Sequence, residues 1–217
     1  MKQYFLFDLD GTVADNGEGI FRSAQYALDA FGIHGESQEN LRRFVGPPLD
    51  QSFMEFYGFS REQALEAVKK YRERYHVKGV LENHLYPGIP ECLERLSQVG
   101  QVCLATSKPQ VFARKILEMN GILPLFSQVV GAELDGTRTD KAQVIAAVLE
   151  FLGNPPKDQV LMIGDRKHDV LGAKVQGIQC VGVGYGYAPP GELEAAGADY
   201  LVPTVEELER LCLRLAS

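Results

Sequence analysis

A short apolar run near the start of the chain ends in two aspartates, and it limits the possible folds more than any other feature. The run covers residues 4–7, and Asp8 and Asp10 follow it one residue apart. A run that is apolar on both faces is typical of a buried strand in a parallel sheet. Such sheets bind ligands at the carboxyl ends of their strands. Two carboxylates at that position repel each other, so this interpretation requires a cation between them. The alternative interpretation is a strand that ends in an ordinary Asp-Gly turn.

Strand and helix signals alternate along the chain after residue 86. Short apolar runs predict strands over 102–106, 128–130, 160–164, 179–183 and 200–202. Segments with helical spacing separate these runs, and a last helix is expected over 205–215. This alternation favours an α/β fold, a Rossmann-like parallel sheet covered by helices on both faces.

The block between residues 15 and 85 differs from the rest because it carries helical signals and no strand signal. Ser60 and Gln63 have the spacing of a capping box at the start of a long helix, and Pro47 and Pro48 mark a rigid break. We therefore expect an α/β core domain formed by residues 1–14 and 86–217. Residues 15–85 are expected to form a helical domain inserted into it.

Composition excludes several classes of function. The 217 residues carry a net charge of -7, which argues against general nucleic-acid binding. No apolar run has the length of a membrane span, and the start of the chain lacks a signal-peptide pattern, so no membrane partner is expected. The four cysteines form no Cys-x-x-Cys pair, which favours a reducing cytoplasm. They are Cys92, Cys103, Cys180 and Cys212.

Polar side chains gather where the predicted strands end. Asp8 and Asp10 follow the first strand. Thr106, Ser107 and Lys108 stand where the second strand ends, and Lys141 opens a later helix. Asp165 and Asp169 follow the strand over 160–164. Because the carboxyl ends of parallel strands share one edge of a sheet, we expect these groups to converge in one crevice.

This set of groups suits transfer of a phosphoryl group to a carboxylate. A carboxylate can attack phosphorus without prior deprotonation, and Asp10 is placed to protonate the leaving oxygen. Asp8, Asp165 and Asp169 supply the hard oxygen ligands that Mg²⁺ prefers. Thr106 or Ser107 offers a hydroxyl to the phosphoryl oxygens. Lys108 and Lys141 are rival candidates for holding the charge of the phosphate and of the nucleophile.

These motifs resemble those of the phosphatase branch of the haloacid dehalogenase superfamily. Asp8-Leu9-Asp10-Gly11-Thr12 matches the first motif, Thr106-Ser107 the hydroxyl motif, Lys141 the lysine motif, and Gly164-Asp165 with Asp169 the acidic motif. The resemblance covers the whole chain and implies that residues 15–85 are a small helical cap. It also implies an aspartyl-phosphate mechanism with Asp8 as nucleophile and Asp10 as acid and base. The Mg²⁺ ion would then be held by Asp8, the Asp10 backbone carbonyl and Asp165.

Within that branch the sequence is similar to phosphoglycolate phosphatases and, more closely, to a bacterial 5'-nucleotidase-like group. The second likeness rests on Phe44-Val45-Gly46-Pro47-Pro48-Leu49, Glu82-Asn83, Tyr86-Pro87-Gly88, Ala105-Thr106-Ser107-Lys108-Pro109 and Leu134-Asp135-Gly136-Thr137-Arg138. The expected substrate is a small phosphorylated metabolite, either a nucleoside 5'-monophosphate or phosphoglycolate. Lys108, Arg42, Arg43 and Gly11 are candidate substrate-binding residues, and a monomer or homodimer is expected.

Four other functions remain open. A 2-haloacid dehalogenase shares the implied fold but has no use for Asp10 as an acid. A β-phosphoglucomutase-like phosphotransferase shares every motif, and only its products distinguish it. A response-regulator receiver also gathers aspartates, a hydroxyl group and a lysine around Mg²⁺, but it is much shorter. The last alternative is a non-catalytic protein that binds Mg²⁺ and phosphate.

Overall fold

The computed structural model of the chain describes residues 1–135 and 137–217, and Gly136 of the segment quoted above lies outside them. The described residues fall into two compact units. The core unit contains Met1–Asp15 and Leu85–Ser217, and the helical unit contains Asn16–His84. The sequence places the two boundaries after residues 14 and 85. That the units are separate domains stays a prediction.

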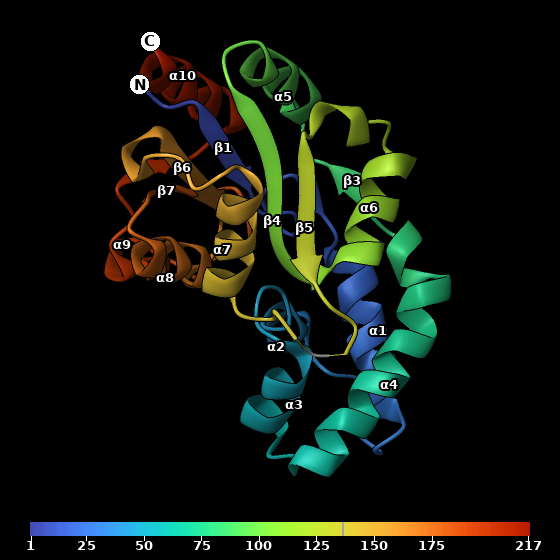
Figure 1. Ribbon diagram of the computed structural model, residues 1–217. Coiled ribbons are helices and arrows are strands. Elements are labelled where there is room, and N and C mark those ends of the chain that lie inside the picture. The colour runs from blue at the N-terminus through green and yellow to red at the C-terminus, as the bar shows by residue number, and fades with distance from the viewer. Residues whose placement is uncertain (136) are drawn as a thin grey trace. The chain divides into compact units, whose positions relative to one another are not determined.

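A parallel sheet of six strands forms the centre of the core unit (Figure 1). The strands are β1 (Tyr4–Phe7), β4 (Gln101–Pro109), β5 (Gln128–Ala132), β6 (Val160–Gly164), β7 (Gln179–Val183) and β8 (Tyr200–Val202). Their order is β5-β4-β1-β6-β7-β8, and each strand pairs with its neighbours in parallel. The chain builds outward from β1 in both directions, so the order reverses at β1, where ligands bind in such sheets. The expected α/β fold is confirmed.

Helices follow most strands of the core unit. They are α5 (Ile89–Ser97), α6 (Gln110–Met119), α7 (Lys141–Phe151), α8 (Lys167–Gln176), α9 (Glu192–Ala196) and α10 (Val205–Ala216), with 3₁₀ turns at Leu123–Leu125 and Lys157–Gln159. Helices α7 and α8 pack on each other, as do α5 and α10. None of the helices among the described residues is long and apolar enough to cross a bilayer.

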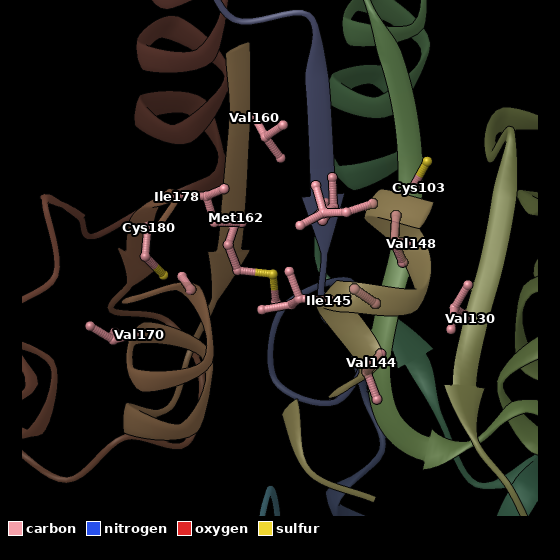
Figure 2. Close-up of a cluster of buried hydrophobic side chains, with 14 of the residues drawn as sticks. Cys103, Val130, Val144, Ile145, Val148, Val160, Met162, Val170, Ile178 and Cys180 are labelled. Carbon is pink, nitrogen blue, oxygen red and sulfur yellow. The ribbon is translucent and has the colours of Figure 1, made fainter. Parts of the chain in front are cut away.

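The apolar strands bury side chains on both faces of the sheet. Because successive strand residues point to opposite faces, Leu6 lies on one face while Phe5 and Phe7 lie on the other. Leu6 belongs to a buried cluster with the apolar residues of α7 and α8. Figure 2 shows part of this cluster, with side chains of α7 between those of β4 and β6. Phe5 and Phe7 are also fully buried, so the second face is covered as well.

Helices make up most of the helical unit. They are α1 (Gly17–Asp29), α2 (Gln38–Arg42), α3 (Leu49–Tyr57) and α4 (Arg61–Val77), followed by a 3₁₀ turn at Gly79–Leu81. The predicted capping box is present, because the Ser60 hydroxyl accepts from Gln63 N and the Gln63 side chain accepts from Ser60 N. Helices α1 and α4 pack along each other and bury Ala24, Ala27 and Ala67 within the unit.

Four elements differ from the sequence-based expectation. Strand β4 runs on to Pro109, beyond the predicted end at residue 106, so Ser107 and Lys108 lie within it rather than after it. Its pairing with β5 shifts between Ala105 and Pro109, which is how the strand accommodates this polar extension. The short helix α9 is not foreseen, nor are the two-residue strands β2 (Ala14–Asp15) and β3 (His84–Leu85), which pair as a separate sheet.

Candidate active site

Asp8 is the first residue after the central strand. Its backbone N–H donates to Ile163 O at 2.9 Å, which continues the ladder between β1 and β6. Its side chain is buried, and its Oδ1 lies 2.8 Å from Lys141 Nζ. The strand therefore holds this carboxylate inside the protein, beside the ammonium group of Lys141.

Lys141 is the first residue of α7, and Asp140 caps that helix by accepting from Ala142 N and Gln143 N. The Lys141 ammonium lies 2.8 Å from Asp8 Oδ1, 2.8 Å from Asp169 Oδ1 and 3.0 Å from Ala105 O. Burial by itself lowers the pKa of Lys141, but the charges of Asp169 and Asp8 raise it above its ordinary value. Lys141 is therefore a buried cation.

Three buried carboxylates lie together at the ends of β1 and β6. One ligand oxygen from each of Asp8, Asp165 and Asp169 lies within 4.8 Å of the others. Burial and the charges of Asp169 and Asp8 raise the pKa of Asp165 well above its usual range. Burial also raises the pKa of Asp169 to about 6, although Lys141 opposes this rise. Both shifts arise mainly from burial, and the neighbouring carboxylates add to them.

The donor set of this cluster fits a divalent cation. Asp169 has little freedom to serve as a ligand, because its Oδ2 accepts from Arg166 N at 3.0 Å and its Oδ1 faces Lys141. Asp165 Oδ2 accepts from Tyr187 N at 2.7 Å, whereas its buried Oδ1 has no hydrogen-bond partner. An unsatisfied buried carboxylate oxygen beside Asp8 is what a hard cation such as Mg²⁺ needs.

Asp10 has different surroundings from Asp8. Both its oxygens accept from Lys108 Nζ, at 2.9 and 3.0 Å, and both side chains are largely buried. The extended β4 brings Lys108 there, so the two candidate lysines divide between the two aspartates. Thr106 is buried and its Oγ1 accepts from Lys108 N at 3.2 Å, while Ser107 is half-buried in the same strand.

Gly11 is placed by close packing against the acidic cluster. Its φ is +82°, and a Cβ added there would lie 2.0 Å from Asp165 Oδ2 and 2.8 Å from Tyr187 Cδ2. The structure thus explains the glycine by lack of space and by backbone conformation. A role in substrate binding stays a prediction.

Gly11→Ala is expected to destabilise the protein by about 2 to 5 kcal/mol, since it adds a steric overlap to backbone strain. The matched control is Gly32→Ala, because Gly32 has φ +77° but no atom within 4 Å of an added Cβ. That control should lose only about 1 kcal/mol. Thermal unfolding of both variants measures the difference, and equal Tm values would contradict the close-packing explanation.

The two candidate arginines belong to the helical unit. Arg42 is the last residue of α2, and Arg43 follows it. Both are exposed, and the Arg43 guanidinium lies 3.8 Å from the centre of the Phe56 ring. The substrate-binding role stays a prediction for both arginines.

Sequence reasoning missed the loop that follows β7. Tyr187 donates its backbone N–H to Asp165, and its hydroxyl donates to Asp15 Oδ1. The pattern Gly184-Tyr185-Gly186-Tyr187 directly after a predicted strand is the signal that could have identified it. Arg166 was missed too, and its guanidinium forms a buried ion pair with Glu192 at 2.7 Å.

Known proteins are similar to this chain in sequence and in fold. The family described as haloacid dehalogenase-like hydrolase matches residues 5–183. The chain is 49% identical over 191 residues to a 5'-nucleotidase of Pseudomonas aeruginosa, covering 88% of this chain and 86% of that one. It is 30% identical to a phosphoglycolate phosphatase of Vibrio parahaemolyticus, covering 93% and 92%. It is also 39% identical to the tyrosine-protein kinase PtkA of Mycobacterium tuberculosis, but it spans only 63% of that protein.

The solved structure of a predicted phosphatase from Clostridium acetobutylicum superposes with a TM-score of 0.95 at 43% identity, over 99% of each chain. The chain therefore belongs to the haloacid dehalogenase-like hydrolase family and is an enzyme of that family. Within the family, its likeness is to the phosphatase branch.

Proposed function

We propose that this protein hydrolyses phosphomonoesters with Mg²⁺ through an aspartyl-phosphate intermediate on Asp8. The observation that carries the proposal is that the two aspartates of the first motif have different surroundings. Asp8 lies beside Lys141 in the acidic cluster, whereas Asp10 lies outside that cluster and pairs with Lys108. One carboxylate is thereby suited to attack phosphorus and the other to exchange protons.

The first half of the proposed reaction transfers the phosphoryl group to the enzyme. Asp8 attacks phosphorus, the bond from phosphorus to the ester oxygen breaks, and Asp10 gives that oxygen a proton. Because both Asp10 oxygens accept from Lys108, Asp10 must release Lys108 and take up a proton before it can donate. Thr106 or Ser107 donates its hydroxyl to the phosphoryl oxygens, and Lys141 keeps Asp8 in place.

The second half returns the enzyme to its starting state. Asp10, now deprotonated, takes a proton from a water molecule that attacks the phosphorus of the aspartyl phosphate. The acyl phosphate bond breaks, inorganic phosphate leaves and Asp8 is restored as a carboxylate. A bound Mg²⁺ would be held by Asp8, the Asp10 backbone carbonyl and Asp165, with Asp169 beside them, and would offset negative charge on the transferring group.

The substrate we propose is a small phosphorylated metabolite, either a nucleoside 5'-monophosphate or phosphoglycolate. The relatives named 5'-nucleotidase and phosphoglycolate phosphatase support these two classes, and the higher identity favours the first. We also propose a cytoplasmic protein, monomeric or homodimeric, without a nucleic-acid or membrane partner. The net charge of -7 argues against a nucleic-acid partner, and the four buried cysteines, all free among the described residues, favour the cytoplasm.

A screen of phosphate release tests the proposal. The purified chain is incubated with Mg²⁺ and a panel of nucleoside 5'-monophosphates, phosphoglycolate and hexose phosphates, and inorganic phosphate is measured. We expect release from at least one of the first two classes. Isomerised sugar phosphate without release would instead indicate the phosphoglucomutase-like alternative. Transfer from ATP to a tyrosine peptide would place the chain with the relative named as a kinase.

Metal removal gives a separate prediction. EDTA should abolish phosphate release, and Mg²⁺ at about 100 times its Kd should stabilise the folded protein by about 2.7 kcal/mol. Asp165→Asn should remove most of this stabilisation, whereas Asp158→Asn, which changes an exposed aspartate, should keep it. Thermal unfolding with and without Mg²⁺ measures the effect. Full phosphate release by the EDTA-treated protein would contradict a metal-dependent reaction.

A further inference from the structure

The loop after β7 packs against two parts of the candidate site at once. Its residues 184–187 contact the segment that follows β1 and the acidic cluster at the end of β6. A Cβ added to Gly186 would lie 2.4 Å from Asp165 Cβ and 2.4 Å from Gly11 O. The loop therefore approaches both as closely as a backbone can, and it joins segments that are far apart in the sequence.

Tyr187 fixes the orientation of the Asp165 carboxylate. Its backbone N–H donates to Asp165 Oδ2 at 2.7 Å, and this leaves Oδ1 as the oxygen without a partner. The hydrogen bond therefore leaves Oδ1 as the oxygen available to a cation. Groups that orient a metal ligand in this way affect metal affinity although they never contact the metal.

The Tyr187 side chain is itself held at two points. Its ring lies against Gly11, and its hydroxyl donates to Asp15 Oδ1 in β2. The neighbouring Tyr185 hydroxyl donates to Thr12 O at 3.0 Å. The loop is therefore bonded at two points to the segment that follows β1, at Thr12 and at Asp15.

We propose that Tyr187 is a positioning residue that couples Asp15 to the metal-binding orientation of Asp165. The hydroxyl bond to Asp15 anchors the side chain, and the anchored residue holds its N–H on Asp165 Oδ2. Asp15 is the last residue of the core unit before the helical unit begins. A change at Asp15 that breaks its bond to Tyr187 therefore changes metal affinity. The inference rests on the proposed function, because it assumes that Asp165 is a metal ligand.

Binding of Mn²⁺ to the substrate-free protein tests the coupling, with free Mn²⁺ measured by electron paramagnetic resonance. Tyr187→Phe keeps the ring and the backbone N–H but loses the hydroxyl, and Asp15→Ala loses the acceptor. Each should raise the Kd for Mn²⁺ about tenfold. Asp15→Asn keeps an oxygen acceptor and should stay within about twofold of the wild type. The double variant, Tyr187→Phe with Asp15→Ala, should bind no worse than either single variant, because both remove one bond.

Tyr26→Phe is the matched control, because Tyr26 is exposed and its hydroxyl contact with Glu73 is long, at 3.4 Å. The Tm of each metal-free variant is measured alongside. A lower Tm with an unchanged Kd would reduce Tyr187 to a stabilising residue and overturn the proposal, as would additive losses in the double variant. A wild type that does not bind Mn²⁺ would overturn this inference and the proposed function together. Bound Mn²⁺ without phosphate release from any substrate would overturn the proposed function alone.

Discussion

Asp8→Asn is expected to lower kcat for phosphate release by at least about 10⁴-fold, because an amide cannot replace the attacking carboxylate. The side chain is nearly isosteric, so the ladder bond from Asp8 N to Ile163 O should persist and the fold should be retained. Phosphate release from the best substrate of the screen, followed with Mg²⁺ present, measures the loss.

Two controls separate this loss from general damage. Asp158→Asn makes the same chemical change at an exposed site and should leave kcat unchanged. The metal-free Asp8→Asn protein should unfold no earlier than the wild type, because it removes one of the mutually repelling carboxylates. If Asp8→Asn kept a tenth of the wild-type rate, another group would have to be the nucleophile.

Lys141→Met is expected to impair both stability and activity. The change keeps the length of a side chain that packs tightly, since a Cβ at Gly172 would lie 2.8 Å from Lys141 Cγ. It removes the ammonium that lies 2.8 Å from Asp8 and 2.8 Å from Asp169, which leaves buried carboxylates without their cation. We expect a loss of about 3 kcal/mol and a fall in Tm of roughly 10 °C.

The comparison of Mg²⁺ with EDTA makes this second prediction specific. The loss in Tm should be larger in EDTA, because a bound cation would neutralise part of the uncompensated charge. Lys115→Met, which removes an exposed lysine of α6, should change Tm by no more than a degree or two in either condition. An equally small effect of Lys141→Met would show that its ion pairs contribute nothing net to folding.

Much of the core and of its site could be predicted because the signals are local. Strand β1 is an unbroken apolar run, and burial on both faces of a parallel sheet requires such a run. The convergence of Asp8, Asp165 and Lys141 then follows from topology alone, since all lie at the carboxyl edge of one sheet. The capping box at Ser60 was equally visible because two residue types three positions apart define it.

The pairing of individual side chains could not be predicted in the same way. Which lysine meets which aspartate depends on how far β4 continues past Ala105, and that extension carries polar residues with no strand signal. The role of Tyr187 depends on a loop that packs on residues 172 positions away in the sequence, at Asp15. Contacts of this kind arise from tertiary packing, which neither residue spacing nor periodicity encodes.

The short sheet formed by β2 and β3 has a consequence for how the chain can change over evolutionary time. Val13 O accepts from Tyr86 N at 3.3 Å, so the core unit already holds together the two points where its chain departs and returns. Closing the intervening segment therefore costs little whatever its length, since each doubling of a loop adds only about 0.6 kcal/mol. Residues 16–83 can therefore be lengthened, shortened or exchanged while β1 and its aspartates stay in register.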